Sequence, residues 1–316
     1  MGLAASNLAV ACGVTRAEDE PTVEAPTPVP PTAVSETPTP VSPEGLRTYG
    51  EKLGIETGAW IAQTPFTASL SSSNPYDELV MREFNLIGGG LGWPIQPTNI
   101  PNSFVPGGMF AQNAAYATAS HSRMRGHAFL WGNRSNLPDW LVAGSFSRTD
   151  MIKMIQDKIR LTINTYKGRV NEWVVVNEPL HIMNNIGVKD DFFAESIGPE
   201  YIEIAFEAAR NTDNSAYLIY NDYGNETPGP VVDANAAQIT NLKSKGLVNA
   251  IGLEMHIDGN HPPTKDALMA NMKSFRDMGI DVLVTELDVN LVNLRGTQEA
   301  RFAVQADIYR CRRGGR

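Results

Sequence analysis

From residue 46 onward, short runs of β-branched and aliphatic residues alternate with longer segments whose apolar positions recur every three or four residues. The short runs are typical of strands and the longer ones of amphipathic helices. Their alternation predicts a parallel sheet whose strands are joined by crossover helices. Seven strands are expected, near residues 54–62, 82–90, 123–131, 172–178, 217–222, 250–256 and 281–287.

The helices between these strands follow from their apolar stripes, which we interpret as core positions rather than as a cofactor site. One helix is expected to stop at Gly168, and its stripe consists of Ile152, Ile155, Ile159 and Ile163. Another should run from the capping residue Thr264 to Gly279, with Leu268, Met272 and Phe275 on one face. A last helix is predicted over residues 298–310, with Ala300, Val304 and Ile308 in its stripe, so that no eighth strand is expected.

The N-terminal region has a different pattern, because eight of the 21 prolines fall within residues 21–43. Such a segment cannot belong to a packed core, and we predict a disordered Pro/Thr-rich linker over residues 18–45. Residues 1–17 resemble the end of a bacterial lipoprotein signal with Cys12 as the acylated residue; a plain secretory signal and an untargeted terminus are the alternatives. The expectation is a bacterial protein that is secreted or anchored at the cell surface, with a possible membrane tether through Cys12.

Composition and charge narrow the class of protein further. The net charge of −9 is the wrong sign for a phosphate-binding surface, so nucleic acid is not an expected partner. Cys12 and Cys311 lie at opposite ends of the chain, which excludes a disulfide scaffold and a cysteine-built zinc site. About 270 residues follow the linker, which suits one (β/α)8 barrel over residues 46–310.

In such a barrel, chemistry is located at the carboxyl ends of the strands. Glu178 and Glu286 each close a hydrophobic run, so both carboxylates are expected to point into one mouth. Asn177, His127 and His256 stand at strand ends beside them. For one glutamate alone, a hydrogen-bonded structural role is as good an explanation. For the whole set, a catalytic role is the better one.

Two carboxylates that face each other across a cleft fit glycoside hydrolysis, which needs a proton donor and an ionised partner that attacks the sugar or activates water. Metal binding is the competing use of glutamate and histidine. It is the weaker hypothesis, because these residues show no local ligand spacing and a metal would not explain Asn177. We therefore expect neither a metal nor a cofactor.

At these residues the sequence resembles glycoside hydrolase family 10 endo-1,4-β-xylanases from about Leu46 to Arg310. Asn-Glu-Pro alone would be weak support, because family 5 cellulases and mannanases also carry it. The Arg-Gly-His and Thr-Glu-Leu-Asp segments favour family 10. The matching motifs occupy residues 125–131, 137–141, 173–178, 220–223, 251–257 and 285–288.

The resemblance implies retaining hydrolysis of xylan with Glu286 as nucleophile and Glu178 as acid and base, their carboxyl groups about 5–5.5 Å apart. It also implies that Asn177 binds a sugar hydroxyl and that His256, held by Asp288, orients the nucleophile. The residues expected to contact xylan or xylo-oligosaccharides are His127, Trp131, Trp93, Tyr223 and Glu254. The alternatives are a retaining glycosidase that acts on another β-glucan or on mannan, and a degenerate carbohydrate-binding relative of low activity.

The chain departs from the family pattern at several places. After the second strand, glycines 88–90, which we interpret as a flexible loop, replace a polar grip on the glycone sugars, although Trp93 is kept. Each hydrogen bond lost there costs about 0.5–1.5 kcal/mol, so weaker glycone binding is expected. Glu254 stands where the family has glutamine, and Gly132 where many relatives have a second histidine.

The basic tail 311–316 has no apolar pattern and indicates a sequence that is truncated before the eighth strand. We therefore expect a barrel with about seven strand-helix units and open edges at its first and seventh strands. Low stability, association and low activity would follow from such edges. The sequence does not indicate an oligomeric state.

Overall fold

The computed structural model describes residues 44–61, 75–94, 107–181, 187–188 and 191–310. All of these belong to one compact unit, Glu44–Arg316. The predictions for the signal-like segment, for Cys12 and Cys311, for linker residues 18–43 and for the tail 311–316 concern positions outside the described residues. No helix within the described ranges is long and apolar enough to cross a membrane.

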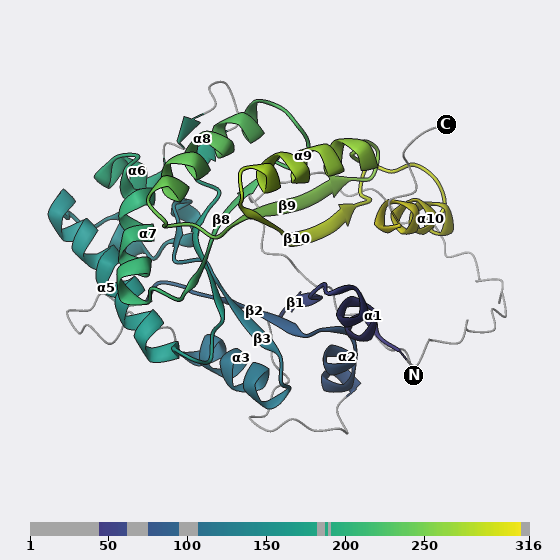
Figure 1. Cartoon of the computed structure of the whole chain (residues 1–316), viewed down its shortest axis with the longest axis horizontal. Coiled ribbons are helices and arrows are strands. Elements are labelled where there is room, and N and C mark those ends of the chain that lie inside the picture. The colour runs from purple at the N-terminus through teal and green to yellow at the C-terminus, as the bar shows by residue number, and fades with distance from the viewer. Residues whose placement is uncertain (1–43, 62–74, 95–106, 182–186, 189–190, 311–316) are drawn as a thin grey trace, which may run out of the picture. The chain divides into compact units, whose positions relative to one another are not determined.

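The strands form one parallel sheet in which neighbours in space follow the order of the chain, β1-β2-β3-β5-β8-β9-β10, while the short β4 also pairs with β5 (Figure 1). This is a partial (β/α)8 barrel, as the sequence predicts. A separate antiparallel pair joins β6 and β7. The strands are β1 Gly58–Trp60, β2 Leu86–Gly90, β3 Arg123–His127, β4 Leu130–Trp131, β5 Glu172–Asn177, β6 Leu180–His181, β7 Gly187–Val188, β8 Tyr217–Tyr223, β9 Ala250–Asp258 and β10 Asp281–Asn290.

The predicted helices are present with the predicted ends. Ser147 and Asp150 form a capping box at the start of the helix that carries the isoleucine stripe, and Thr264 caps the helix that ends before Gly279. The helices are α1 Leu46–Leu53, α2 Pro75–Glu83, α3 Gly108–Ala119, α4 Asp139–Val142, α5 Arg148–Tyr166, α6 Phe192–Ile197, α7 Tyr201–Thr212, α8 Pro230–Ser244, α9 Lys265–Asp277 and α10 Gln298–Tyr309, with a 3-10 turn at Arg134–Asn136.

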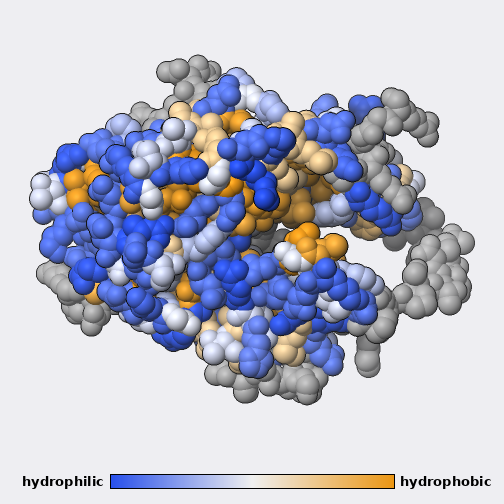
Figure 2. All heavy atoms as spheres, viewed as in Figure 1, coloured by the Kyte–Doolittle hydropathy of each residue, from blue (hydrophilic) through white to orange (hydrophobic). Residues whose placement is uncertain are grey.

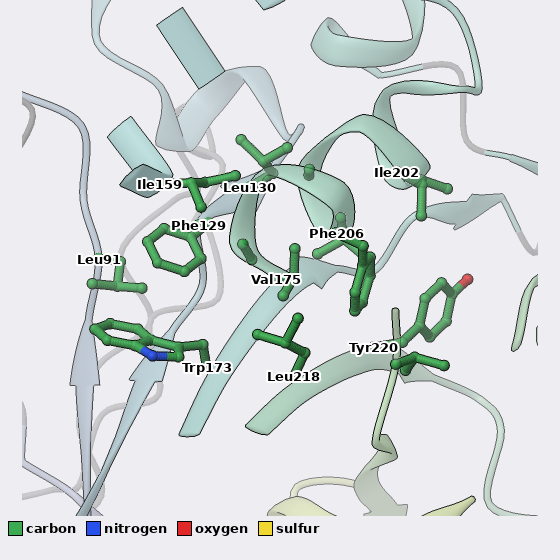
Figure 3. Packing of buried hydrophobic residues seen from close by; sticks show 14 of the residues in the cluster. Leu91, Phe129, Leu130, Ile159, Trp173, Val175, Ile202, Phe206, Leu218 and Tyr220 are labelled. Carbon is green, nitrogen blue, oxygen red and sulfur yellow. The ribbon is translucent and has the colours of Figure 1, made fainter. Parts of the chain in front are cut away.

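The hydrophobic core lies mainly between the outer face of the sheet and the helices that cover it. Figure 3 shows this layer, where Trp173 and Val175 of β5 and Leu218 of β8 pack with Phe206 of α7 and Ile159 of α5. A second, smaller cluster is formed by Val174, Ile219 and Ala250, which lie on the opposite face of the same strands. The inner face is therefore apolar toward the amino ends of these strands, while polar side chains lie at the carboxyl ends.

The glycines after the second predicted strand correct one interpretation, because Gly88–Gly90 are the last three residues of β2 and do not form a flexible loop. A Cβ atom on Gly89 would lie 2.7 Å from Cε of Met124, on the side of α3. Cβ atoms on Gly88 and Gly90 would instead lie 3.0 and 3.3 Å from the indole of Trp60. The row of glycines thus lets side chains pack closely on both faces of β2.

Within the described residues, β1 and β10 are the two ends of the sheet order. Exposed apolar side chains lie on both of them, Trp60 on β1 and Val284 and Leu287 on β10. Figure 2 shows apolar surface in the hollow between the α9–β10 side and the α1–α2 side of this unit. Among the described residues no strand pairs with the outer edge of β1 or of β10, as predicted for the first and seventh strands, while the expected effects on stability and association stay predictions.

Candidate active site

Two interruptions of the strand register place Glu286 and Asn177, the residue before Glu178. On β10 the register shifts between Val284 and Glu286, so that Glu286 pairs with Glu254 of β9. On β5 it shifts between Val174 and Val176, so that Asn177 pairs with Asn221 of β8. Because side chains of a strand alternate between faces, each extra residue reverses the alternation and turns Glu286 and Asn177 toward the inner face.

Glu178 follows β5 directly and has a left-handed backbone conformation, with φ of 48°. This conformation is uncommon for a residue other than glycine and is found often at functional sites. The backbone N–H of Glu178 donates a hydrogen bond of 2.9 Å to the carbonyl oxygen of Asn221. The neighbouring amide of Asn177 donates to Glu178 Oε1 at 3.3 Å. Both contacts hold Glu178 at the carboxyl end of the sheet.

Asn221 links the two glutamates. Its backbone carbonyl binds Glu178, and its fully buried side-chain amide lies 3.4 Å from Glu286 Oε1. The same Nδ2 donates to Asn177 Oδ1 and to Glu254 Oε1, both at 2.7 Å. Its own oxygen accepts a hydrogen bond of 2.5 Å from the hydroxyl of Thr285, the residue at the register shift of β10. One buried amide therefore fixes side chains from three neighbouring strands.

Gly252 of β9 makes room for this amide. A Cβ atom at that position would lie 2.0 Å from Oδ1 of Asn221 and 2.7 Å from the methyl group of Thr285. Real side chains do not approach so closely, and neither neighbour is a flexible end that can move aside. A glycine is therefore required here for the side chain of Asn221 to occupy its position.

Two histidines also lie beside the carboxylate of Glu286. His256 Nε2 lies 3.4 Å from Glu286 Oε2, and His256 Nδ1 contacts Asp288 Oδ2 at 2.5 Å. Hydrogen bonds with Glu254 and Glu286 raise the pKa of His256 to about 11, so this imidazole is charged at neutral pH. Burial is the largest single influence and raises the pKa of Glu286, but the hydrogen bond from His256, the charges of the two histidines and the hydrogen bond from Asn221 together outweigh it, so the pKa is lowered. Glu286 is thus held as a carboxylate.

His127 lies on the opposite side of Glu286, with 3.7 Å between His127 Nε2 and Glu286 Oε1. Burial lowers the pKa of His127, so this imidazole is neutral at pH 7. Its ring meets the indole of Trp60 edge to face, with 5.7 Å between the ring centroids. The nucleophile candidate is therefore flanked by one charged and one neutral imidazole.

Glu254 is buried in this cluster, with 3% of its surface exposed. Burial is the main reason why its pKa rises to about 7; the neighbouring carboxylates Glu286 and Glu178 add to the rise, and the contact with His256 opposes it. The carboxyl group most affected is Glu254 itself.

Three further residues predicted to contact substrate, Tyr223, Trp131 and Trp93, differ in their neighbours. Tyr223 pairs with Glu254 at the end of β8, and burial followed by the charge of Glu178 raises its pKa. Trp131 pairs with Asn177, and its buried indole N–H has no hydrogen-bond acceptor among the described residues. Trp93 instead stacks on Phe193, with ring centroids 5.9 Å apart.

Gly132 has a structural reason to be a glycine. A Cβ atom there would lie 2.1 Å from the carboxyl carbon of Asp191, which caps α6 by accepting from the backbone N–H groups of Phe193 and Ala194. A second histidine at this position would collide with that cap.

Three side chains could each offer an atom to a metal ion. The relevant atoms of Glu254, His256 and Glu286 lie within 4.8 Å of one another. A metal-binding imidazole must be unprotonated, whereas the pKa of His256 is raised to about 11. The cluster is therefore better described as an imidazolium in contact with two carboxyl groups.

Comparison with known proteins places this geometry in a family. The model described as Glycosyl hydrolase family 10 matches residues 45–311. The chain is 31% identical over 269 residues to endo-1,4-beta-xylanase B of Thermotoga neapolitana, a match that covers 84% of this chain and 75% of that relative. The chain belongs to glycosyl hydrolase family 10.

Other members of family 10 agree with this assignment. Endo-1,4-beta-xylanase A of Fusarium oxysporum is 34% identical over 208 residues, which is 63% of this chain and 61% of that relative. Native xylanase 10B of Thermotoga maritima has a TM-score of 0.71 at 30% identity, covering 84% of this chain and 79% of that one. Xylanase 10B of Thermotoga petrophila, in complex with xylobiose, has a TM-score of 0.68 at 28% identity, covering 85% and 80%. The family and the partial barrel expected from the sequence are confirmed.

Three residues that shape the site of this family 10 chain are not among those predicted from the sequence. Asn221 belongs to the family motif at residues 220–223, but only its hydrogen bonds in the structure show that it contacts both glutamates. Thr285 stood beside the nucleophile candidate, and its importance lies in the register shift. For Trp60 the sequence does contain an indication of close packing on the second strand. A tryptophan ends the first strand, and the second strand ends in three glycines.

Proposed function

We propose that this family 10 chain hydrolyses β-1,4 bonds inside the xylan backbone by double displacement, with Glu286 as nucleophile and Glu178 as acid and base. The observation that carries the proposal is the pairing of the two glutamates through Asn221, with Glu286 kept ionised by His256. In the first step Glu178 gives its proton to the glycosidic oxygen while Glu286 Oε attacks the anomeric carbon and the C–O bond breaks. In the second step Glu178 takes a proton from water, which attacks the same carbon and releases Glu286.

The surrounding residues support these roles. His256, itself held by Asp288, donates toward Glu286 and stabilises the carboxylate that leaves the sugar in the second step. Asn177 lies beside Glu178 and pairs with Asn221, which fits the predicted contact with a sugar hydroxyl. His127 lies beside Glu286, Trp131 pairs in register with Asn177 and Tyr223 pairs with Glu254. These three residues and Glu254 are proposed to line the sugar-binding cleft. For Trp93, which packs on Phe193, we propose a supporting position behind the cleft.

The substrate is tested by a panel of xylan, cellulose and mannan, with release of reducing sugar as the readout. The expected result is release from xylan above the other two polymers, and loss of at least about four orders of magnitude in Glu286→Ala, since the covalent step then has no nucleophile. Faster cleavage of cellulose or mannan would make the substrate assignment wrong. Equal activity with and without the Glu286 carboxylate would make the mechanism wrong.

Export is a separate proposal, supported by the signal-like start and the proline-rich stretch of the sequence. An exported enzyme would reach a polymer that is too large to enter a cell, and a lipid on Cys12 would keep it at the cell surface. Fractionation of producing cells, with Cys12→Ala as the comparison, tests both points. Recovery of both proteins in the cytosol would refute export.

A further inference from the structure

The first strand places an aromatic side chain where the second strand has none. Trp60, the last residue of β1, pairs in register with Gly88 of β2. A Cβ atom on Gly88 would lie 3.0 Å from Cε3 of the indole, and one on Gly90 would lie 3.3 Å from its Cζ2 and Cη2. The six-membered ring of Trp60 therefore extends along β2 from Gly88 to Gly90, toward the carboxyl end of the sheet.

This indole lies on the face of the sheet that carries the catalytic candidates. Gly90 pairs in register with His127 of β3, and partners in a parallel ladder point to the same side. The ring centroids of Trp60 and His127 are 5.7 Å apart at an interplanar angle of 84°. His127 in turn lies 3.7 Å from Glu286. A continuous wall thus runs from the nucleophile candidate through an imidazole to the indole.

Trp60 is packed on one side and open on the other. Although it rests against the glycines and His127, 43% of its surface is exposed. The neighbouring positions of β2 offer no side-chain hydrogen-bond donor or acceptor, since residues 88, 89 and 90 are all glycine. Whatever binds along this wall therefore meets an uncharged aromatic surface and backbone.

A pyranose ring suits such a surface. Its faces carry C–H groups, which pack against the electron-rich face of an aromatic ring, while its hydroxyl groups stay in water at the edge. Aromatic side chains also dominate sites for uncharged ligands, because they bury a large area at little cost in conformational entropy. A sugar chain that extends from Glu286 past His127 would lie along this wall.

We propose that Trp60 is a stacking platform for the sugar ring next to the reacting sugar, on the glycone side, and that it determines affinity there in place of hydrogen bonds from β2. The inference rests on the proposed function only for the identity of the polymer. In this proposal a side chain of β1 contacts the substrate, because the three glycines of β2 have no side chain that could do so.

Two substitutions separate stacking from simple coverage of the glycines. Trp60→Leu keeps an apolar side chain over β2 but removes the aromatic face, whereas Trp60→Phe keeps an aromatic face. Leu79→Ala on α2 is the matched control, because Leu79 is 44% exposed and lies on a helix away from the inner face. Each protein is assayed with an aryl β-xylobioside, which has a second glycone sugar, and with an aryl β-xyloside, which has none. Thermal unfolding verifies that each is folded.

The expected result is that Trp60→Leu lowers kcat/KM for the xylobioside about ten-fold, mainly through KM, while the change for the xyloside stays within about two-fold. Trp60→Phe should retain most of the activity, and Leu79→Ala should match the wild type. Equal losses on both substrates, or a Leu variant that matches the Phe variant, would overturn the proposal.

A direct titration keeps this test independent of catalysis. The dissociation constant of xylotriose is measured for the wild type and for Trp60→Leu at a temperature where turnover is negligible, and it should rise about ten-fold in the variant. If the wild type hydrolyses neither glycoside, the proposed function has failed while this titration still decides on Trp60. An unchanged dissociation constant, or no binding of xylotriose to either protein, would refute the platform.

Discussion

On the inner face of the sheet, strands β8 to β10 present an amide, carboxylates and an imidazole, whereas β1 and β2 present an indole and two glycines. Both regions use a missing side chain to admit a neighbouring one. Gly252 leaves room for the amide of Asn221, and Gly88 leaves room for the ring of Trp60. The difference lies in what is admitted. In the first region a glycine permits a hydrogen-bonded hub that joins the two glutamates; in the second it permits a flat apolar wall.

The two regions are expected to affect different kinetic parameters, kcat for the first and KM for the second. The residues around Asn221 hold groups that must act on the bond being broken, so an error in their position should reduce kcat. The wall formed by Trp60 and the glycines contains no group that transfers a proton or attacks the sugar. Changes there should act on KM for substrates that extend past the reacting sugar.

The difference between the two regions can be tested by adding one methyl group to each. Gly252→Ala would place Cβ 2.0 Å from Asn221 Oδ1, and we expect kcat/KM on xylan to fall at least about 100-fold, as for loss of one key polar contact. Gly88→Ala would place Cβ 3.0 Å from the edge of the Trp60 ring, which can tilt away, and we expect a fall within about three-fold. Steady-state kinetics and thermal unfolding of both variants provide the test. Similar losses of activity would mean that the two regions do not differ in function.

A smaller effect is expected from the third carboxyl group, and it appears in the pH dependence of stability. The pKa of Glu254 is raised from 4.5 to about 7, mainly by burial, so the folded chain holds this proton more tightly than the unfolded chain. The resulting stabilisation is complete below pH 4.5 and is lost as the pH rises toward 7. The free energy of unfolding should therefore fall by on the order of 1–3 kcal/mol across this window through Glu254.

The substitution Glu254→Gln removes that titration and should flatten the curve between pH 4.5 and 6.5, as measured by denaturant unfolding. The upper limit avoids His256, whose own contribution is complete below its ordinary pKa of 6.5 and is lost only above it, toward 11. Glu207→Gln is the control, because Glu207 is an exposed residue of α7. A slope that is the same in wild type and in Glu254→Gln would contradict the burial of a protonated Glu254.

Much of this architecture could be predicted from the sequence, because the patterns concerned are local. The isoleucine stripe of α5 and the cap at Thr264 specify helices that the structure contains. The hydrophobic runs that end in Glu178 and Glu286 locate the strands and indicate which end of the sheet carries the chemistry. Family 10 membership follows from the same segments.

The contacts inside the site could not be predicted, because they depend on strand register. An extra residue at Thr285 reverses which side chains of β10 face inward, and no local pattern of polar and apolar residues signals it. Glycine favours irregular structure, so the sequence alone predicts a flexible loop at the glycines of β2. In the structure these positions are strand residues, and close packing against Trp60 and Met124 leaves no room for larger side chains there. Each of these features requires knowledge of the neighbouring strand.

The central claim, double displacement by the pair of glutamates, is tested most directly by the anomeric form of the first product. Proton NMR of the newly released reducing end, recorded before the anomers equilibrate, should show the β-anomer for the wild type, because two successive inversions restore the configuration. A first product in the α-form would show a single displacement through water and would contradict the assignment of Glu286 as nucleophile.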